Sequence, residues 1–322
     1  MNGKKLIKII VVFDLIIVVL LAAVFTFNQE KQTINERVRE SAPGDFVQLS
    51  NGFVHYERTG PGDGELVVLV PGFSVPYYLW DPTVQGLVSE GYQVIRYDLY
   101  GRGYSDRPDA EYDLDFFVHQ LSELTTTLAP GVPFHLIGLS MGGPIAASFA
   151  HQNPEQILSV SLIAPEVLLE DRSPTVSEDE IFPMNVPLLG ELIVGVYLVP
   201  FHLPQSQVDD FYQPERFPDW EEKYREQIQY KGFQRAILST IRNLVKMNPL
   251  EEYEKLHQTG LPTLLIWGKE DQSISYEAIV RLLQIIPETE VLFVEQTAHL
   301  PHYEKAEWVN TEILKFLQMN PK

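Results

Sequence analysis

The chain has 322 residues, no cysteine, and a net charge of −20 from 24 basic and 44 acidic residues. The absence of cysteine excludes disulfides, thiolate nucleophiles and cysteine-based metal sites, and so acidic a chain is a poor candidate for binding nucleic acid. Because 45% of the residues are hydrophobic and 21% are charged, we expect a globular protein with a sizeable core.

The chain begins with a lysine-rich segment and continues with an apolar stretch from residue 6 to residue 27. This stretch is about as long as a helix needs to be to cross the hydrocarbon core of a bilayer, although Asp14 lies within it. We therefore predict a single-pass transmembrane signal anchor over residues 1–27, with a cytoplasmic N-terminus and the rest of the chain outside the cytoplasm. The alternatives are a cleaved signal peptide, which would yield a secreted protein, and a buried or interfacial helix.

Residues 28–44 are polar and charged, and we predict a stalk or linker there. From residue 45 the pattern changes to strands. A hairpin with an Asn-Gly turn is expected at 46–58, and the continuous aliphatic run at 66–70 is typical of a parallel strand buried on both faces. The run ends in Pro71 and Gly72, where glycine allows the chain to turn tightly.

The next expected strand, at 93–97, leads into a glycine-rich loop at 98–108. This loop lacks the third glycine and the Lys-Ser/Thr pair of nucleotide-binding loops, so we do not interpret it as one. The amphipathic segment at 114–129 predicts a helix.

The sequence Gly-Leu-Ser-Met-Gly-Gly at 138–143 follows an apolar run at 134–137 and precedes small apolar residues at 144–151. A strand, Gly-x-Ser-x-Gly and a helix in this order form the nucleophile elbow pattern, in which a sharp turn exposes the serine. Side chains beside so sharp a turn would collide, which accounts for the glycines. The pattern predicts Ser140 as a nucleophile, whereas the alternative is a plain turn with a chance serine.

A further buried strand is expected at 160–164, after which the alternation of strands and helices stops. Residues 165–248 are rich in proline and contain no clear strand, so we predict a helical cap over the carboxyl ends of the strands. The alternation then resumes, with two strands and two helices expected at 263–267, 276–286, 290–294 and 304–319. This order predicts an α/β fold with a mostly parallel central sheet flanked by helices, whose core comprises residues 45–164 and 249–322.

A serine hydroxyl becomes an effective nucleophile when a base removes its proton and a carboxylate orients that base. The last expected strand is followed by a loop containing His299, and the strand before it by a loop containing Asp271. Both loops lie at carboxyl ends of strands, where ligands bind in open α/β sheets. The chain order Ser140, Asp271, His299 is the one expected for this elbow. We therefore assign Ser140 as nucleophile, His299 as general base and then acid, and Asp271 as the orienting acid.

Other assignments remain open at this point. His302 shares the loop of His299 and is the rival base, and Glu270 and Glu166 are the rival acids. The oxyanion hole is expected to consist of the backbone N–H groups of Phe73 and of Met141, the residue after the nucleophile. This chemistry requires no metal or organic cofactor, and we predict none.

Together these motifs resemble the α/β-hydrolase superfamily, which they match over residues 45–320. The resemblance is carried by the elbow at 138–143, the loop at 98–106, Gly-Lys-Glu-Asp at 268–271 and Ala-His at 298–299. It implies the α/β-hydrolase fold. Within the superfamily, Ser-Met-Gly-Gly with a helical cap is similar to monoacylglycerol lipases and esterases, cofactor-free haloperoxidase-like esterases, and carbon–carbon bond hydrolases.

Two positions depart from the pattern of many relatives. Pro71 stands where many have histidine before the oxyanion glycine, and Arg102 where many have histidine in the glycine-rich loop. The first change keeps the backbone donor but removes a side chain that helps to hold the loop. Serine at position 140 argues against the epoxide hydrolase and haloalkane dehalogenase branches, because these need a carboxylate nucleophile.

The leading hypothesis is a membrane-anchored serine hydrolase that cleaves carboxylic esters through an acyl-enzyme intermediate. Apolar and aromatic residues of the cap suit an acyl chain, although such residues also form a cap's own core. A nearby membrane places monoacylglycerols and other lipid esters among the candidate substrates. The same triad could instead cleave an amide or a carbon–carbon bond, and a pseudohydrolase acting as receptor or scaffold is the third interpretation. The predicted partners are a small ester and the membrane.

Overall fold

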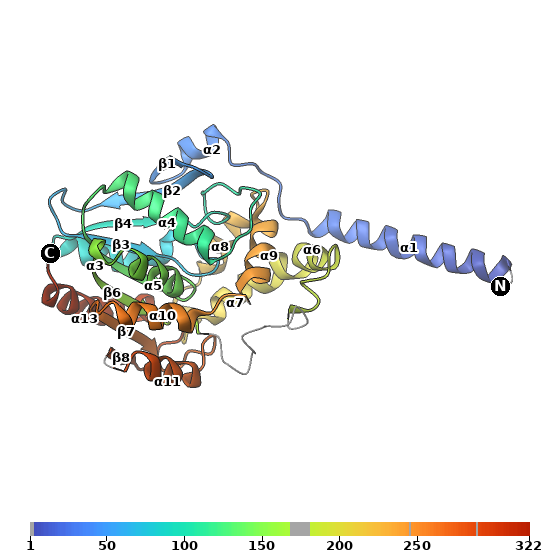
Figure 1. The fold of residues 1–322 in the computed structure, drawn as a ribbon. Helices are drawn as coiled ribbons and strands as arrows, with labels where there is room; N and C mark the ends of the chain where they lie inside the picture. Colours follow the sequence, from blue (N-terminus) through green and yellow to red (C-terminus); the bar gives the residue numbers. More distant parts are fainter. Residues whose placement is uncertain (1–2, 168–180, 245, 288) are drawn as a thin grey trace.

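The computed structural model describes residues 3–167, 181–244, 246–287 and 289–322, and its centre is a sheet with helices on both faces (Figure 1). The sheet has eight strands in the order β1-β2-β4-β3-β5-β6-β7-β8. β2 pairs antiparallel with β1 and with β4, and the other neighbouring strands pair in parallel. The predicted α/β fold with a mostly parallel sheet is therefore confirmed.

The central strands are apolar on both faces because helices cover both faces. In β3, Val67 and Leu69 pack into one core cluster, whereas Leu66, Val68 and Val70 pack into the other, as the two-residue period of a strand requires. The strands are β1 (Asp45–Leu49), β2 (Gly52–Thr59), β3 (Leu66–Val70), β4 (Gln93–Tyr97), β5 (Phe134–Leu139), β6 (Ile157–Ile163), β7 (Thr263–Gly268) and β8 (Glu290–Val294).

Each face of the sheet has its own set of helices. Leu121 of α4 and Tyr253 of α10 belong to the cluster that also contains residues of α5 and α11. Leu87 of α3 and Ile313 of α13 belong to the opposite cluster. These helices are α3 (Asp81–Ser89), α4 (Leu114–Leu128), α5 (Gly142–Gln152), α10 (Pro249–Gln258), α11 (Tyr276–Ile285) and α13 (Ala306–Met319), with the short α12 (Pro301–Glu304) before α13.

The cap, residues 165–248, joins β6 to the segment before β7, and its described part contains helices and no strand of the sheet. Residues 168–180 of it lie outside the described residues. The ring of Trp220 lies 4.9 Å from that of Phe211 in the cap and from that of Tyr303 on α12, so the cap aromatics pack onto the sheet domain and share a core cluster with β3. The cap elements are α6 (Leu189–Ile193), the π-helical segment η4 (Val194–His202), α7 (Leu203–Asp209), α8 (Trp220–Ile228) and α9 (Phe233–Leu244).

The first helix, α1 (Gly3–Phe27), extends away from the body of the molecule (Figure 1). At its end, Phe27 packs edge-to-face on Phe201 of the cap, with ring centroids 5.4 Å apart. Within the described residues, no helix combines the length and the apolar character needed to cross a membrane. The predicted transmembrane anchor over residues 1–27 is therefore not supported. Asp14, an exposed residue of α1, is the kind of charged group that a bilayer core disfavours.

The segment after α1, predicted as a stalk, is attached to the cap. The backbone N–H of Lys31 donates to the carbonyl oxygen of Gln229 at 2.8 Å, and Gln32 forms an isolated β-bridge with Tyr230. A short helix, α2 (Glu36–Ser41), follows, and Asn35 caps its N-terminus. Residues 28–44 thus lie against the folded domain and do not act only as a spacer.

Candidate active site

Ser140 lies in a tight turn between the end of β5 and the start of α5 at Gly142. Its φ of +52° falls in the left-handed region that non-glycine residues rarely adopt. A Cβ atom added at Gly138 would lie 2.3 Å from the carbonyl oxygen of Gly142, and one added at Gly142 would lie 2.4 Å from that of Val70. Close backbone approach therefore requires the two glycines, and the turn places Ser140 at the wall of a cavity.

His299 and Asp271 lie side by side on the loops that follow β8 and β7. Nδ1 of His299 is 2.9 Å from Oδ2 of Asp271. The other oxygen, Oδ1, accepts from the backbone N–H groups of Ser273 at 2.8 Å and Ile274 at 3.1 Å, so the carboxylate is held in one orientation. With Nδ1 occupied, Nε2 is the ring nitrogen that can take up a proton. His299 and Ser140 line the same cavity of about 520 Å³.

The pKa of His299, the predicted general base, sets the pH dependence that the prediction implies for activity. Burial alone would lower this pKa, but Asp271, Asp210 and Glu166 outweigh burial and raise it to about 9. A general base must be neutral to accept a proton, so kcat/KM is expected to rise with pH and to level off above about pH 9. The pH profile of kcat/KM for an uncharged ester measures this, and an acid limb near the ordinary histidine value of 6.5 would contradict it.

The rival residues occupy other environments. His302 packs its ring on Trp80, directs Nε2 to the carbonyl oxygen of Leu79 at 3.2 Å, and has its pKa lowered by burial to about 3. Glu270 accepts from the backbone N–H of Thr297 at 3.1 Å, which binds it to the histidine loop. Of the three rivals, His302, Glu270 and Glu166, only Glu166 lines the cavity with His299.

The loop after β3 lies against Ser140. A Cβ atom added at Gly72 would come 3.3 Å from the Cβ of Ser140, a tight contact that shows how closely this loop approaches Ser140. Gly72, Phe73 and Met141 all line the cavity that contains Ser140. The two backbone N–H groups predicted to form the oxyanion hole thus belong to residues that share a cavity wall with Ser140.

Arg102 holds this loop in place, a contact that sequence reasoning did not identify. Its Nε donates to the carbonyl oxygen of Phe73 at 2.8 Å, Nη1 to that of Tyr100 at 3.3 Å, and Nη2 to Oγ1 of Thr240 on α9 at 2.8 Å. The side chain is buried, which lowers its pKa to about 10. The arginine thus joins the loop after β3, the glycine-rich loop and the cap. The only signal in the sequence was its replacement of the usual histidine.

The cavity wall combines an apolar part with an acidic part. No lysine or arginine belongs to this wall among the described residues. Its apolar side chains are Phe73, Val75, Leu79, Leu139, Met141, Leu198, Leu203, Ile241, Leu244 and Leu300. Its polar side chains besides Ser140 and His299 are Ser74, Glu166, His202, Ser206, Gln207, Asp209, Asp210, Gln272 and Ser273.

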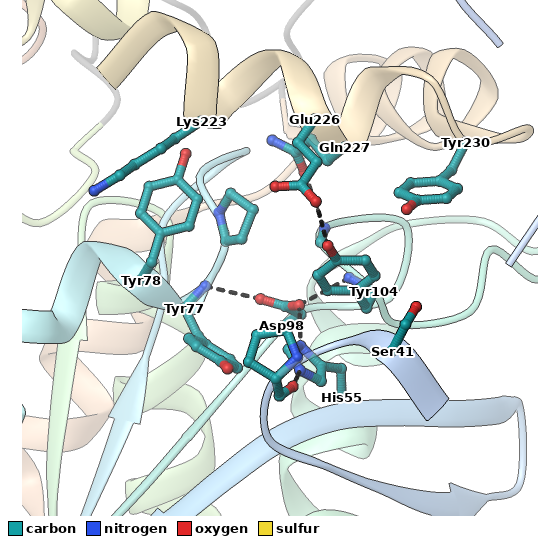
Figure 2. Close-up of a pocket in the computed structure, with 13 residues that line it drawn as sticks. Ser41, His55, Tyr77, Tyr78, Asp98, Tyr104, Lys223, Glu226, Gln227 and Tyr230 are labelled. Carbon is teal, nitrogen blue, oxygen red and sulfur yellow. Dashed lines mark hydrogen bonds and ion pairs between the residues drawn. The ribbon is translucent and has the colours of Figure 1, made fainter. Parts of the chain in front are cut away.

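A second cavity, of about 350 Å³, lies where the stalk, the glycine-rich loop and α8 meet (Figure 2), and no member of the predicted triad lines it. Asp98 lies at its base and accepts from the backbone N–H groups of Tyr77 at 2.8 Å and Tyr104 at 2.9 Å. It also pairs with Nδ1 of His55 at 2.7 Å. A Cβ atom at Gly103 would collide with Asp98. This buried network fixes the loop that carries Arg102.

The family assignment agrees with this geometry. A family model described as alpha/beta hydrolase fold matches residues 65–306. The chain therefore belongs to the alpha/beta hydrolase fold family, and the predicted resemblance is confirmed.

Relatives of this chain have different activities in their names. It is 29% identical to Lipase 1 of Psychrobacter immobilis over 77% of this chain and 75% of the lipase. It is 25% identical to a 2-hydroxy-6-oxononadienedioate/2-hydroxy-6-oxononatrienedioate hydrolase of Dechloromonas aromatica over 88% of this chain and 99% of that protein. A crystal structure of a membrane phospholipase A, described as a bacterial virulence factor, is 25% identical, with a TM-score of 0.64 and 98% of both chains covered.

Proposed function

We propose that this protein is a serine hydrolase that cleaves carboxylic esters through an acyl-enzyme intermediate. The observation that carries the proposal is the placement of Ser140, on a strained elbow, in one cavity with His299, whose Nδ1 is paired with Asp271. A nucleophile, a base and a group that orients the base are the parts that such a reaction needs.

The proposed reaction has two halves. Oγ of Ser140 attacks the ester carbonyl carbon while its proton passes to Nε2 of His299, and the negative charge on the carbonyl oxygen is met by the N–H groups of Phe73 and Met141. The tetrahedral intermediate collapses, the alcohol leaves with the proton from His299, and the acyl group stays on Ser140. Water then attacks the acyl-enzyme while His299 takes its proton, and the second tetrahedral intermediate releases the carboxylic acid as His299 returns that proton to Oγ of Ser140. Asp271 keeps the imidazole oriented throughout.

The cavity wall favours an uncharged ester with an apolar acyl group. Its leucines, isoleucine and methionine can accept an aliphatic chain, whereas Glu166, Asp209 and Asp210 form an acidic region without a lysine or arginine among the described wall residues. A substrate with two carboxylates, such as the dioate in the name of one relative, would be repelled here. Carbon–carbon bond cleavage of such a dianion is therefore the weaker alternative.

A substrate series tests the proposal. The purified protein would be assayed with p-nitrophenyl esters of increasing acyl length, a monoacylglycerol, the corresponding p-nitroanilide amide, and a ring-cleavage dicarboxylate. Turnover of neutral esters well above that of the amide and the dicarboxylate is expected. Faster cleavage of the amide or of the dicarboxylate would contradict the ester proposal and favour an amide hydrolase or a carbon–carbon bond hydrolase. No turnover of any substrate, together with no labelling by a fluorophosphonate, would favour the pseudohydrolase.

We also propose that the esters are reached at a lipid surface. Phe25 of α1 and Tyr197 and Phe201 of η4 are exposed large apolar or aromatic residues, and the contact of Phe27 with Phe201 brings the two elements together. Exposed apolar groups in one region indicate an interaction surface. Co-flotation with phosphatidylcholine vesicles tests this, and we expect weaker binding to anionic vesicles because the chain carries a charge of −20. Failure to float with either kind of vesicle would contradict it.

A further inference from the structure

Asp210 lies at the C-terminal end of the cap helix α7 and also lines the cavity that contains Ser140 and His299. It is a half-buried residue of the cap, whereas the proposed triad comes entirely from loops of the sheet. The cap therefore contributes a carboxylate to the neighbourhood of the proposed base.

Two hydrogen bonds connect Asp210 to the two loops of the proposed triad. Its main-chain carbonyl oxygen accepts from the backbone N–H of His299 at 3.0 Å. Its Oδ1 accepts from Oγ of Ser273 at 2.7 Å, and the backbone N–H of Ser273 in turn donates to Asp271 at 2.8 Å. One residue of the cap thus holds the histidine loop through its backbone and the acid loop through its side chain.

We propose that Asp210 is a positioning residue that couples the cap to the catalytic base, by holding both triad loops and by placing a negative charge beside His299. The inference deepens the proposed ester hydrolysis and rests on it. It also distinguishes two carboxylates with different tasks. Asp271 pairs with the imidazole ring and orients it, whereas Asp210 contacts only the backbone of His299 and acts on the ring through its charge.

The negative charge of Asp210 adds to those of other acidic groups around His299 and favours the protonated imidazole. The titratable groups that face His299 or share its cavity come from every element around it: Asp271 from the loop after β7, Glu166 from the segment after β6, His302 from its own loop, and His202, Asp209 and Asp210 from the cap. Asp210 is among the groups that raise the pKa of His299. Loss of its charge should therefore make His299 a weaker base without rotating its ring.

The variant Asp210→Asn tests the proposal, because it keeps the shape, the main-chain carbonyl and an oxygen acceptor for Ser273 while removing the charge. The acid limb of kcat/KM is expected to move to lower pH by about half a unit or more, because His299 then stays neutral down to a lower pH. The ring of His299 would be titrated in parallel by NMR of protein labelled with ¹³C-histidine, with the signal assigned from His299→Gln. That signal should shift in the same direction.

Two further variants separate the charge from the contact. Asp209→Asn removes a negative charge from the neighbouring residue, whose side chain is exposed and accepts from Gln205. It should move the acid limb of kcat/KM by less than Asp210→Asn does. Ser273→Ala removes the side-chain contact but leaves both charges, so the limb should stay in place while the plateau falls by about threefold.

The outcomes are distinguishable. Equal shifts in Asp209→Asn and Asp210→Asn, or none in either, would overturn the role of Asp210. The NMR titration requires no turnover. If the pKa of His299 is lower in Asp210→Asn than in the wild type but the wild type has no esterase activity, the proposed function fails and the role of Asp210 stands.

Discussion

Replacing Ser140 with alanine is expected to lower kcat for ester hydrolysis by about 10⁴-fold or more, because the acyl-enzyme can no longer form. The fold should be retained. Alanine adopts a left-handed backbone elsewhere in this chain, since Ala164 after β6 has a φ of +40°. The free energy of unfolding should therefore change by less than about 1 kcal/mol. Assay of the best ester substrate, with a urea titration, measures both quantities.

Ser148→Ala is the matched control. Ser148 is a buried serine of α5, the helix that follows the elbow, so its loss is the same chemical change close to Ser140 but outside the cavity wall. A fluorophosphonate should label the wild type and Ser148→Ala, and it should not label Ser140→Ala. Equal labelling of the two variants would show that another residue is the nucleophile.

The second large effect is expected for Arg102→Lys. Lysine keeps a positive charge but cannot reach Phe73, Tyr100 and Thr240 together as the planar guanidinium does. The carbonyl of Phe73 would then lose the contact that fixes the loop after β3. Misplacement of a donor by about 1 Å can cost about 100-fold in rate, so we expect kcat to fall by about that factor while KM changes little.

Arg107→Lys provides the comparison for this effect. Arg107 comes from the same loop and donates to the carbonyl oxygens of Ser105 and Gly103, away from Phe73. Each substitution is expected to destabilise the protein by about 1–2 kcal/mol, since buried acceptors lose donors, but only Arg102→Lys should reduce kcat strongly. Equal losses of kcat in both variants would mean that general loosening of the loop, and not the contact with Phe73, is responsible.

The sheet could be predicted from the sequence because its strands have a strong local signal. The run at 66–70 is aliphatic at every position, which fits a strand covered on both faces, and the structure places β3 there. The elbow could also be predicted, because a Cβ atom added at Gly138 or Gly142 would lie less than 2.5 Å from a backbone oxygen. A pattern with a direct steric cause can be recognised in the amino-acid sequence alone.

Other features depend on contacts between distant segments. His299 and His302 share one loop, and only the structure distinguishes them, by placing one beside Asp271 and the other on Trp80. The contacts of Arg102 and Asp210 join the core to the cap across long stretches of sequence, and no local pattern indicates which residues meet there. The N-terminal helix was predicted from hydrophobicity alone, and that signal did not reveal its packing on the cap.

The cap begins after β6 and ends before β7, and these two strands are parallel neighbours in which Ile163 pairs with Ile266. An insertion whose ends meet adjacent strands can be lengthened, shortened or replaced without changing the order of the sheet. For protein engineering, this makes the cap an exchangeable module that can be grafted from another member of the family. A graft that alters substrate range would still need a carbonyl acceptor where Asp210 now meets the backbone of His299.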